Sequence, residues 1–203
     1  MKTVLITAFE SYDRWSTNSS WDALVALTRE LPTAPRVVTR RYPVDFEKTK
    51  AKLAEDLAAN YDYTLHLGQA PGSSRVHLEA VAINVAGESQ QSPDDFDALV
   101  PGGPAGYRTR LPLATWASKI RAAGIPVQIS YHAGTYLCNA IFYLAQHLAA
   151  EKKLKTQSAF IHLPLSPSQV LAERHDVPSL PTNLCAEALQ LILAQLTQPV
   201  ESA

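Results

Sequence analysis

Cys138 is the residue in this sequence whose position best suits nucleophilic chemistry. It lies in the first turns of a predicted helix, after a strand that ends near Ser130 and a turn through Gly134. The unpaired N–H groups and the dipole of a helix N-terminus favour negative charge, and therefore a thiolate. The same N–H groups could hold an oxyanion if the sulfur attacked a carbonyl carbon. The alternative is that Cys138 is a small buried residue, because free cysteine is commonly buried.

A histidine near this thiol could act as its general base. His162 lies at the end of a predicted buried strand and just before Pro164, where an imidazole faces the crevice side of a sheet. It could take the thiol proton and return it to a leaving amine. His132 is nearer to Cys138 in the sequence and is the competing candidate. For any single histidine a hydrogen-bonded structural role is the alternative, and the others are His66, His77, His147 and His175.

Glu79 interrupts an otherwise apolar strand pattern. A buried carboxylate must be paired or solvated, because burying an unpaired charge is costly. Glu79 could accept a hydrogen bond from a histidine ring and so fix its productive tautomer, which is the third role in a nucleophile–base–orienter triad. The alternative is an ion pair with Arg75, which lies four residues earlier and on the same face of the strand.

The elements that must position these residues alternate between strand and helix patterns. Strands are predicted at 3–7, 36–42, 61–67, 75–84, 127–130 and 159–163. Helices are predicted at 21–31, 46–57, 113–123, 136–150 and 181–196. Asn18 and Asp45 are the expected caps of the first two helices. The stretch 87–112 is rich in Gly, Pro, Asp and Gln and predicts a long loop.

This alternation predicts the α/β class, with a three-layer α/β/α arrangement around a mostly parallel twisted sheet. No repeat, low-complexity block or linker divides the chain, so we expect a single domain over residues 1–203. In such sheets the ligand crevice lies outside the carboxyl ends of the strands, which directs attention to the side chains that follow them.

Composition excludes several classes of function. Eighteen Lys and Arg against nineteen Asp and Glu leave a net charge of -1, which argues against a nucleic-acid or polybasic membrane partner. The two cysteines cannot build a disulfide framework, and they fit a reducing, cytoplasmic setting. We expect neither a targeting segment nor a membrane span, because the first apolar run is far shorter than the ~20 residues that a span needs. Cys185 shares a helix face with apolar residues and is expected to pack in the core.

Three segments together resemble the pyroglutamyl peptidase I family of cysteine peptidases. Residues 133–139 (AGTYLCN) are similar to its cysteine motif, 79–84 (EAVAIN) to its glutamate motif and 160–164 (FIHLP) to its histidine motif. Residues 7–12 resemble its first loop, and 103–107 with 111–112 resemble its substrate-side loop and the helix after it. The order and spacing agree from about residue 2 to residue 165.

The resemblance implies a cysteine exopeptidase that removes N-terminal pyroglutamate from peptides by thiol acyl transfer, with no metal or cofactor. Cys138 would attack the acyl carbon, His162 would act as general base and then acid, and Glu79 would orient His162. Phe9 and Tyr12 match the aromatic residues that bind the substrate ring in the family. Members of the family are often homo-oligomers, so a dimer or tetramer is expected here.

The flat, neutral pyroglutamate ring needs apolar walls and one or two hydrogen bonds. Gln69 lies at a strand end where its amide could contact the lactam, although it could instead only satisfy the backbone of its own loop.

The sequence departs from the family pattern around the substrate side. Ala8 and Ser11 replace a glycine and a proline of the first loop, and Tyr12 brings a hydroxyl to a position that is usually phenylalanine. Ala80 replaces the arginine that commonly follows the glutamate, and 85–90 lacks the expected stretch. Two further hypotheses therefore stay open: a related cysteine amidase with altered specificity for small amides, and a catalytically silent binding protein on the same fold.

Overall fold

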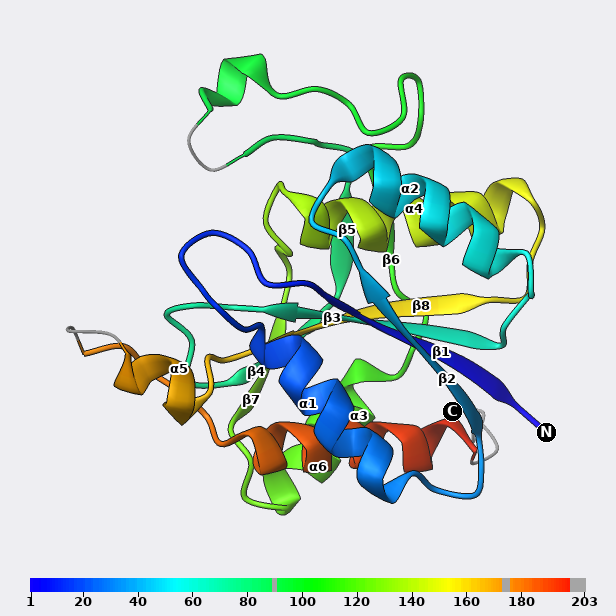
Figure 1. Ribbon diagram of the computed structural model, residues 1–203. Helices are drawn as coiled ribbons and strands as arrows, with labels where there is room; N and C mark the ends of the chain where they lie inside the picture. The colour runs from blue at the N-terminus through cyan, green and yellow to red at the C-terminus, as the bar shows by residue number, and fades with distance from the viewer. Residues whose placement is uncertain (89–90, 173–175, 198–203) are drawn as a thin grey trace.

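A six-stranded sheet forms the centre of the molecule (Figure 1). The computed structural model describes residues 1–88, 91–172 and 176–197. The strands lie in the order β2-β1-β3-β8-β4-β7. Their bounds are β1 (Thr3–Phe9), β2 (Arg36–Tyr42), β3 (Tyr63–Gln69), β4 (Val76–Glu79), β7 (Val127–Ser130) and β8 (Gln157–Leu163). The predicted α/β class is confirmed.

All neighbouring strands run parallel except β4 and β8, which are antiparallel. The carboxyl ends of β1, β3 and β8 therefore meet at one edge of the sheet. The reversed strand β4 lies alongside the last residues of β8, with His77 opposite His162 and Glu79 opposite Phe160. Residues of β4 thus reach the same region as the ends of the parallel strands.

Helices cover both faces of the sheet (Figure 1). On one side are α1 (Ser19–Leu27), α3 (Leu113–Ala122) and α6 (Thr182–Leu196), and on the other are α2 (Phe46–Leu57) and α4 (Leu137–Glu151). The described residues also form three short helices: η1 (Thr28–Glu30), η2 (Pro93–Asp95) and α5 (Pro167–Leu171). Within the described ranges, no helix has the length and apolar character needed to cross a membrane.

Both predicted helix caps are present. The Asn18 side chain accepts a hydrogen bond from the N–H of Ser20, and that of Asp45 accepts one from the N–H of Lys48 at 2.8 Å. Each cap satisfies a backbone donor that has no partner within its helix. Together they fix where α1 and α2 begin, directly after the loops that follow β1 and β2.

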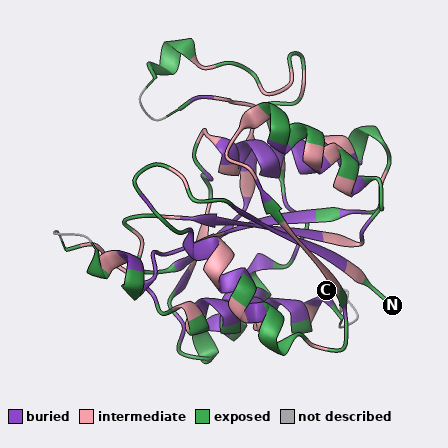
Figure 2. Ribbon diagram, viewed as in Figure 1, coloured by how far each residue is buried: buried purple, intermediate pink, exposed green. Residues whose placement is uncertain are grey.

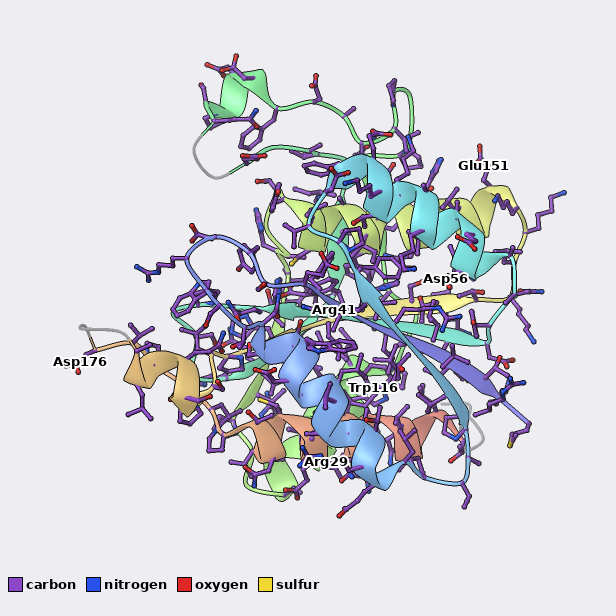
Figure 3. The ribbon with its side chains drawn as sticks, in the orientation of Figure 1. Arg29, Arg41, Asp56, Trp116, Glu151 and Asp176 are labelled. Atoms are coloured by element: carbon purple, nitrogen blue, oxygen red, sulfur yellow. The ribbon has the colours of Figure 1, made fainter. Side chains whose placement is uncertain are left out.

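The two cores lie between the sheet and its helices, where Figure 2 shows the central strands β1, β3 and β8 and the inner helix faces as mostly buried. Trp116 of α3 is fully buried in the core on the α1 and α6 side (Figure 3). On the opposite side Asp56 of α2 accepts hydrogen bonds from Arg40 Nε at 3.0 Å and from the Tyr42 hydroxyl at 2.8 Å, which ties α2 to β2. Cys185 of α6 packs in the core on the α1 and α6 side of the sheet, as the sequence predicts.

The single strand predicted at 75–84 is wrong. After Glu79 the chain leaves the main sheet, and β5 (Val81–Ile83) pairs antiparallel with β6 (Gly106–Arg108) beside α4. Ala80 forms the junction, because its N–H donates to Ser130 O and its carbonyl accepts from the N–H of Thr109. Both halves carry strand-forming residues, so the sequence pattern does not mark this bend. The predicted loop 87–112 in turn contains η2 and β6.

His66 is enclosed in the middle of the sheet. It is 0% exposed, and its Nδ1 lies 2.8 Å from Thr7 Oγ1 on the neighbouring strand. Its Nε2 has no hydrogen-bond partner within the described part of the chain. Burial therefore lowers the pKa of His66 to about 3, and the ring is neutral in the folded protein.

We expect His66 to make the fold sensitive to acid. Between its ordinary pKa of 6.5 and the folded value of about 3, the unfolded chain binds the extra proton, so the free energy of unfolding falls as the pH falls. The contribution is about 1.4 kcal/mol per pH unit. Denaturant unfolding of the wild type and His66→Asn at several pH values between 7 and 4 measures it, and the variant is expected to have the shallower slope.

His132→Asn is the matched control, because His132 is exposed and its replacement should leave the slope unchanged. An equal slope in the wild type and His66→Asn would contradict the assignment.

Candidate active site

A pocket of about 560 Å³ opens at the carboxyl ends of the central strands. Phe9 from the end of β1, Tyr12 from the following loop and Gln69 from the end of β3 line it. Cys138 from the start of α4 and His162 from β8 line it as well. Five of the six predicted site residues therefore share one cavity, and the sixth, Glu79, lies behind His162.

Cys138 is the second residue of α4 and is half-buried. Gly134, with a φ of 82°, provides the left-handed turn that reverses the chain between β7 and this helix. The N-cap residue Tyr136 makes no side-chain cap hydrogen bond. The backbone N–H groups of the first turn, including that of Cys138, are thus left for a ligand at the pocket.

Gly68 allows α4 to approach the sheet closely. A Cβ atom at this position would lie 2.8 Å from Cys138 Sγ and 2.7 Å from Phe160 Cζ, which is too close for any side chain. Gly68 also pairs directly with His162 in the β3–β8 register. The missing side chain therefore makes room for the thiol beside the imidazole. Sequence analysis missed this role, although a glycine inside a buried strand is a known sign of close approach.

The His162 ring lies between the thiol and the carboxylate. Its Nδ1 lies 2.8 Å from Glu79 Oε1, and Cys138 lies close enough to the ring to influence its pKa. Burial disfavours the charged ring, but the negative charge and hydrogen bond of Cys138 together with those of Glu79 outweigh it and raise the pKa of His162 to about 10. The arrangement therefore stabilises a thiolate–imidazolium pair.

Glu79 is fully buried and pairs with His162 rather than with Arg75. Its strand places it directly opposite Phe160, two residues before His162, and so on the same face of the sheet. Its Oε2 atom has no hydrogen-bond partner in the parts of the chain that the structure covers. The carboxylate charge is consequently directed at the imidazole.

Among the described residues, His132 and His147 make their contacts away from Cys138. His132, the competing base, is exposed, and its Nδ1 accepts a hydrogen bond from the N–H of Gly134. His147 lies nine residues beyond Cys138 on α4 and is 2.9 Å from the Tyr107 hydroxyl. His175 lies outside the described residues.

Gln69 is fixed by two hydrogen bonds. Its Oε1 accepts from the N–H of Ser19 at 2.8 Å and from Gln169 Nε2 at 2.7 Å. Its own Nε2 is buried, lies near the Tyr12 hydroxyl and has no well-aligned acceptor among the described residues. A donor is therefore present at the pocket wall, beside the apolar ring of Phe9.

Tyr12 brings a neutral hydroxyl into the pocket. Burial, followed by the charges of Cys138 and Asp13, raises the pKa of Tyr12 to about 12, although the contact with Gln69 acts in the opposite direction. Asp13 adopts a φ of 55°. The loop thus makes a left-handed turn at a residue other than glycine, because aspartate tolerates this conformation better than most residues.

Asn139 is a second residue whose role the sequence did not reveal. It is fully buried, and its side chain accepts from the N–H of Ile83 and donates to the carbonyls of Ile83 and Val85, each at 2.9 Å. The N–H of Gly87 donates to the carbonyl of Thr135, and the Thr135 hydroxyl donates to the carbonyl of Gly87. The segment after β5 is thus fastened to both sides of Cys138. The sequence signal for this role was an asparagine directly after the cysteine, within an otherwise apolar helix pattern.

Comparison with known proteins agrees with this geometry. The model of the pyroglutamyl peptidase family matches residues 2–198. The pyrrolidone-carboxylate peptidase of Pseudomonas fluorescens is 34% identical over 100% of this chain and 96% of that protein. The corresponding protein of Pectobacterium carotovorum is 36% identical over 100% and 97%.

Solved structures give the same result. The pyrrolidone carboxyl peptidase of Fervidobacterium islandicum superimposes with a TM-score of 0.91 at 31% identity and covers 97% of this chain and 98% of its own. A mutant pyrrolidone carboxyl peptidase from Pyrococcus furiosus gives 0.90 at 30% identity, with 98% and 99% covered. With its sequence and fold matched over nearly the whole length, the chain belongs to the pyroglutamyl peptidase family.

Proposed function

We propose that this protein is a cysteine exopeptidase that removes pyroglutamate from the N-terminus of peptides. One observation carries the proposal: the Cys138 thiol contacts the His162 ring in the pocket, and His162 Nδ1 lies 2.8 Å from the buried Glu79 carboxylate. This is the geometry of an activated nucleophile whose base is oriented by a third group. Family membership points to the same reaction.

Cys138 acts as the nucleophile. His162 takes the thiol proton, and the thiolate attacks the acyl carbon of the pyroglutamyl bond. The N–H groups of the first turn of α4, which no side chain caps, stabilise the oxyanion that forms. When the intermediate collapses, His162 gives its proton to the leaving amine. Water, deprotonated by His162, then hydrolyses the thioester and releases pyroglutamate.

Glu79 keeps His162 in the productive state. By accepting from Nδ1 it fixes the ring orientation and leaves the other ring nitrogen for the thiol. Its negative charge also stabilises the imidazolium, because the two groups are in direct contact and shielded from water. Glu79 acts through His162 and is a positioning residue.

Phe9, Tyr12 and Gln69 form the substrate subsite in this proposal. The pyroglutamate ring is flat and neutral, and the Phe9 ring supplies an apolar wall next to Cys138. The Nε2 of Gln69, which has no acceptor among the described residues, is a donor for the lactam carbonyl. The Tyr12 hydroxyl is the specific observation that favours a second candidate, an amidase for a different small cyclic or N-blocked amide.

We also propose that the protein works as a single peptidase domain, in the cytoplasm and as a dimer or tetramer. A reducing compartment keeps Cys138 as a free thiol, which the mechanism requires. Light scattering after size-exclusion chromatography measures the assembly, and a mass equal to the 22.2 kDa chain would contradict the oligomer.

The first prediction concerns the nucleophile. Cys138→Ser should lower kcat/KM for a fluorogenic pyroglutamyl amide by at least about 10³-fold, because a serine hydroxyl is not ionised by this histidine. Cys185→Ala is the matched control and should leave the rate unchanged, since Cys185 is buried in the other core.

An unchanged rate in Cys138→Ser would refute the mechanism. A wild type that cleaves other N-blocked amides in a substrate panel, but not pyroglutamyl amides, would favour the amidase. A wild type that cleaves none of them would favour a silent binding protein.

The second prediction concerns the orienting carboxylate. Glu79→Gln should lower kcat by about 10²–10⁴-fold, because the neutral amide no longer stabilises the imidazolium. It should also lower the pKa of His162 from about 10, so that activity is lost at a lower pH on the basic side of the pH–rate profile. Glu55→Gln, on the exposed side of α2, is the control and should not change the profile. A basic limb that stays in place would contradict the assigned role of Glu79.

A further inference from the structure

A second histidine lies against the Glu79 carboxylate. His77 Nδ1 is 4.0 Å from Glu79 Oε1, the same oxygen that His162 Nδ1 contacts at 2.8 Å. His77 stands directly opposite His162 in the antiparallel β4–β8 pair and two residues before Glu79. Directly opposed residues, and residues two apart in one strand, share a face of the sheet. The carboxylate therefore stands between two imidazoles.

The outer nitrogen of His77 is held by neutral groups. Its Nε2 lies 2.8 Å from Ser73 Oγ and 3.0 Å from Gln128 Nε2. An amide nitrogen can only donate, so the Gln128 contact requires Nε2 to accept and leaves the proton of the neutral ring on Nδ1, which faces Glu79. A second proton would have to bind at Nε2, against the Gln128 donor.

His77 can exchange protons with solvent, unlike the Glu79 carboxylate that it faces. Its side chain is 22% exposed, whereas that of Glu79 is 1% exposed. Burial lowers the pKa of His77, the Glu79 charge raises it, and the charges of His162 and Arg75 lower it further. The net direction is downward, so His77 is neutral at neutral pH and gains its charge on acidification, below pH 6.5.

We propose that His77 is a positioning residue that sets the acid limit of Cys138 reactivity. While neutral, it leaves the Glu79 carboxylate to His162. When a proton from solvent binds His77 Nε2, the new positive charge competes for Glu79 and opposes the imidazolium of His162. The His162 proton then passes to Cys138 Sγ, so the thiolate becomes a thiol and one nucleophile is lost for each proton bound.

Alkylation of Cys138 tests this without a peptide substrate. The rate at which iodoacetamide modifies Cys138, followed by mass spectrometry from about pH 4.5 to pH 8, reports the thiolate fraction. His77→Gln should match the wild type within about twofold above pH 7.5, because one neutral side chain replaces another. Its acid limb should lie about one pH unit below that of the wild type, since the opposing charge is removed.

His147→Gln is the matched control. His147 is also a partly buried histidine bonded to a hydroxyl, that of Tyr107, but it lies more than two turns further along α4. Its replacement should leave the acid limb in place. Circular dichroism at each pH ensures that only folded protein is compared.

Two outcomes would overturn the proposal. One is an acid limb at the same pH in the wild type and His77→Gln. The other is a uniform loss of rate at every pH, which a purely structural role would cause. Should His77→Gln not fold, His77→Asn and NMR titration of the histidine rings in the wild type replace it. The His162 signals must then shift as His77 titrates, and a His162 signal that ignores this step refutes the proposal.

The inference rests on the proposed function only in treating Cys138 as the nucleophile, and the two can fail separately. A protein that cleaves no pyroglutamyl amide, yet has an acid limb that depends on His77, would refute the proposed function alone. Cleavage with an alkylation profile that does not depend on His77 would refute the inference alone.

Discussion

The contact between the N-terminus of α4 and the sheet at Gly68 is the constraint on which the site depends. With no side chain at this position, Cys138 Sγ occupies the space that a Cβ atom would fill, next to the strand that carries His162. The thiol then lies beside the imidazole at the wall of the pocket, where their opposite charges stabilise each other. The pKa of His162 is raised because the absence of a side chain at Gly68 lets the thiol lie this close to the imidazole.

The reversed strand β4 is equally necessary. In an entirely parallel sheet the residues facing His162 would come from a strand running beside it in the same direction. Here β4 runs antiparallel to β8, so Glu79 and His77 both lie beside the end of β8 that carries His162. The short antiparallel pair of β4 and β8 thus places both Glu79, which orients His162, and His77, which lies against the same carboxylate.

Sequence reasoning predicted much of this arrangement. Strong apolar periods located the main strands and helices, and Asn18 and Asp45 marked two helix starts, because these signals are local. Position and residue type made Cys138, His162 and Glu79 candidates, and the resemblance of three segments to one family joined them into a triad. The bend at Ala80 was missed because both halves of 75–84 carry strand-forming residues. The role of Gly68 was missed because the residues that it accommodates, Cys138 and Phe160, lie far away in the sequence. Asn139 was overlooked for the same reason.

Asn139 and Asn84 hold the base of the polypeptide between β5 and β6 in place, and the Ala86–Asp97 pair closes it further out. Asn139 fastens Ile83 and Val85 to α4, and Asn84 holds Val100 through two side-chain hydrogen bonds. Loop-closure entropy grows only slowly with length, so residues beyond the Ala86–Asp97 pair and the Gly87–Thr135 hydrogen bonds can be inserted or deleted at little cost. A change of length in the outer part of residues 84–100 therefore leaves the position of Cys138 unchanged. Related chains can differ in length at this place.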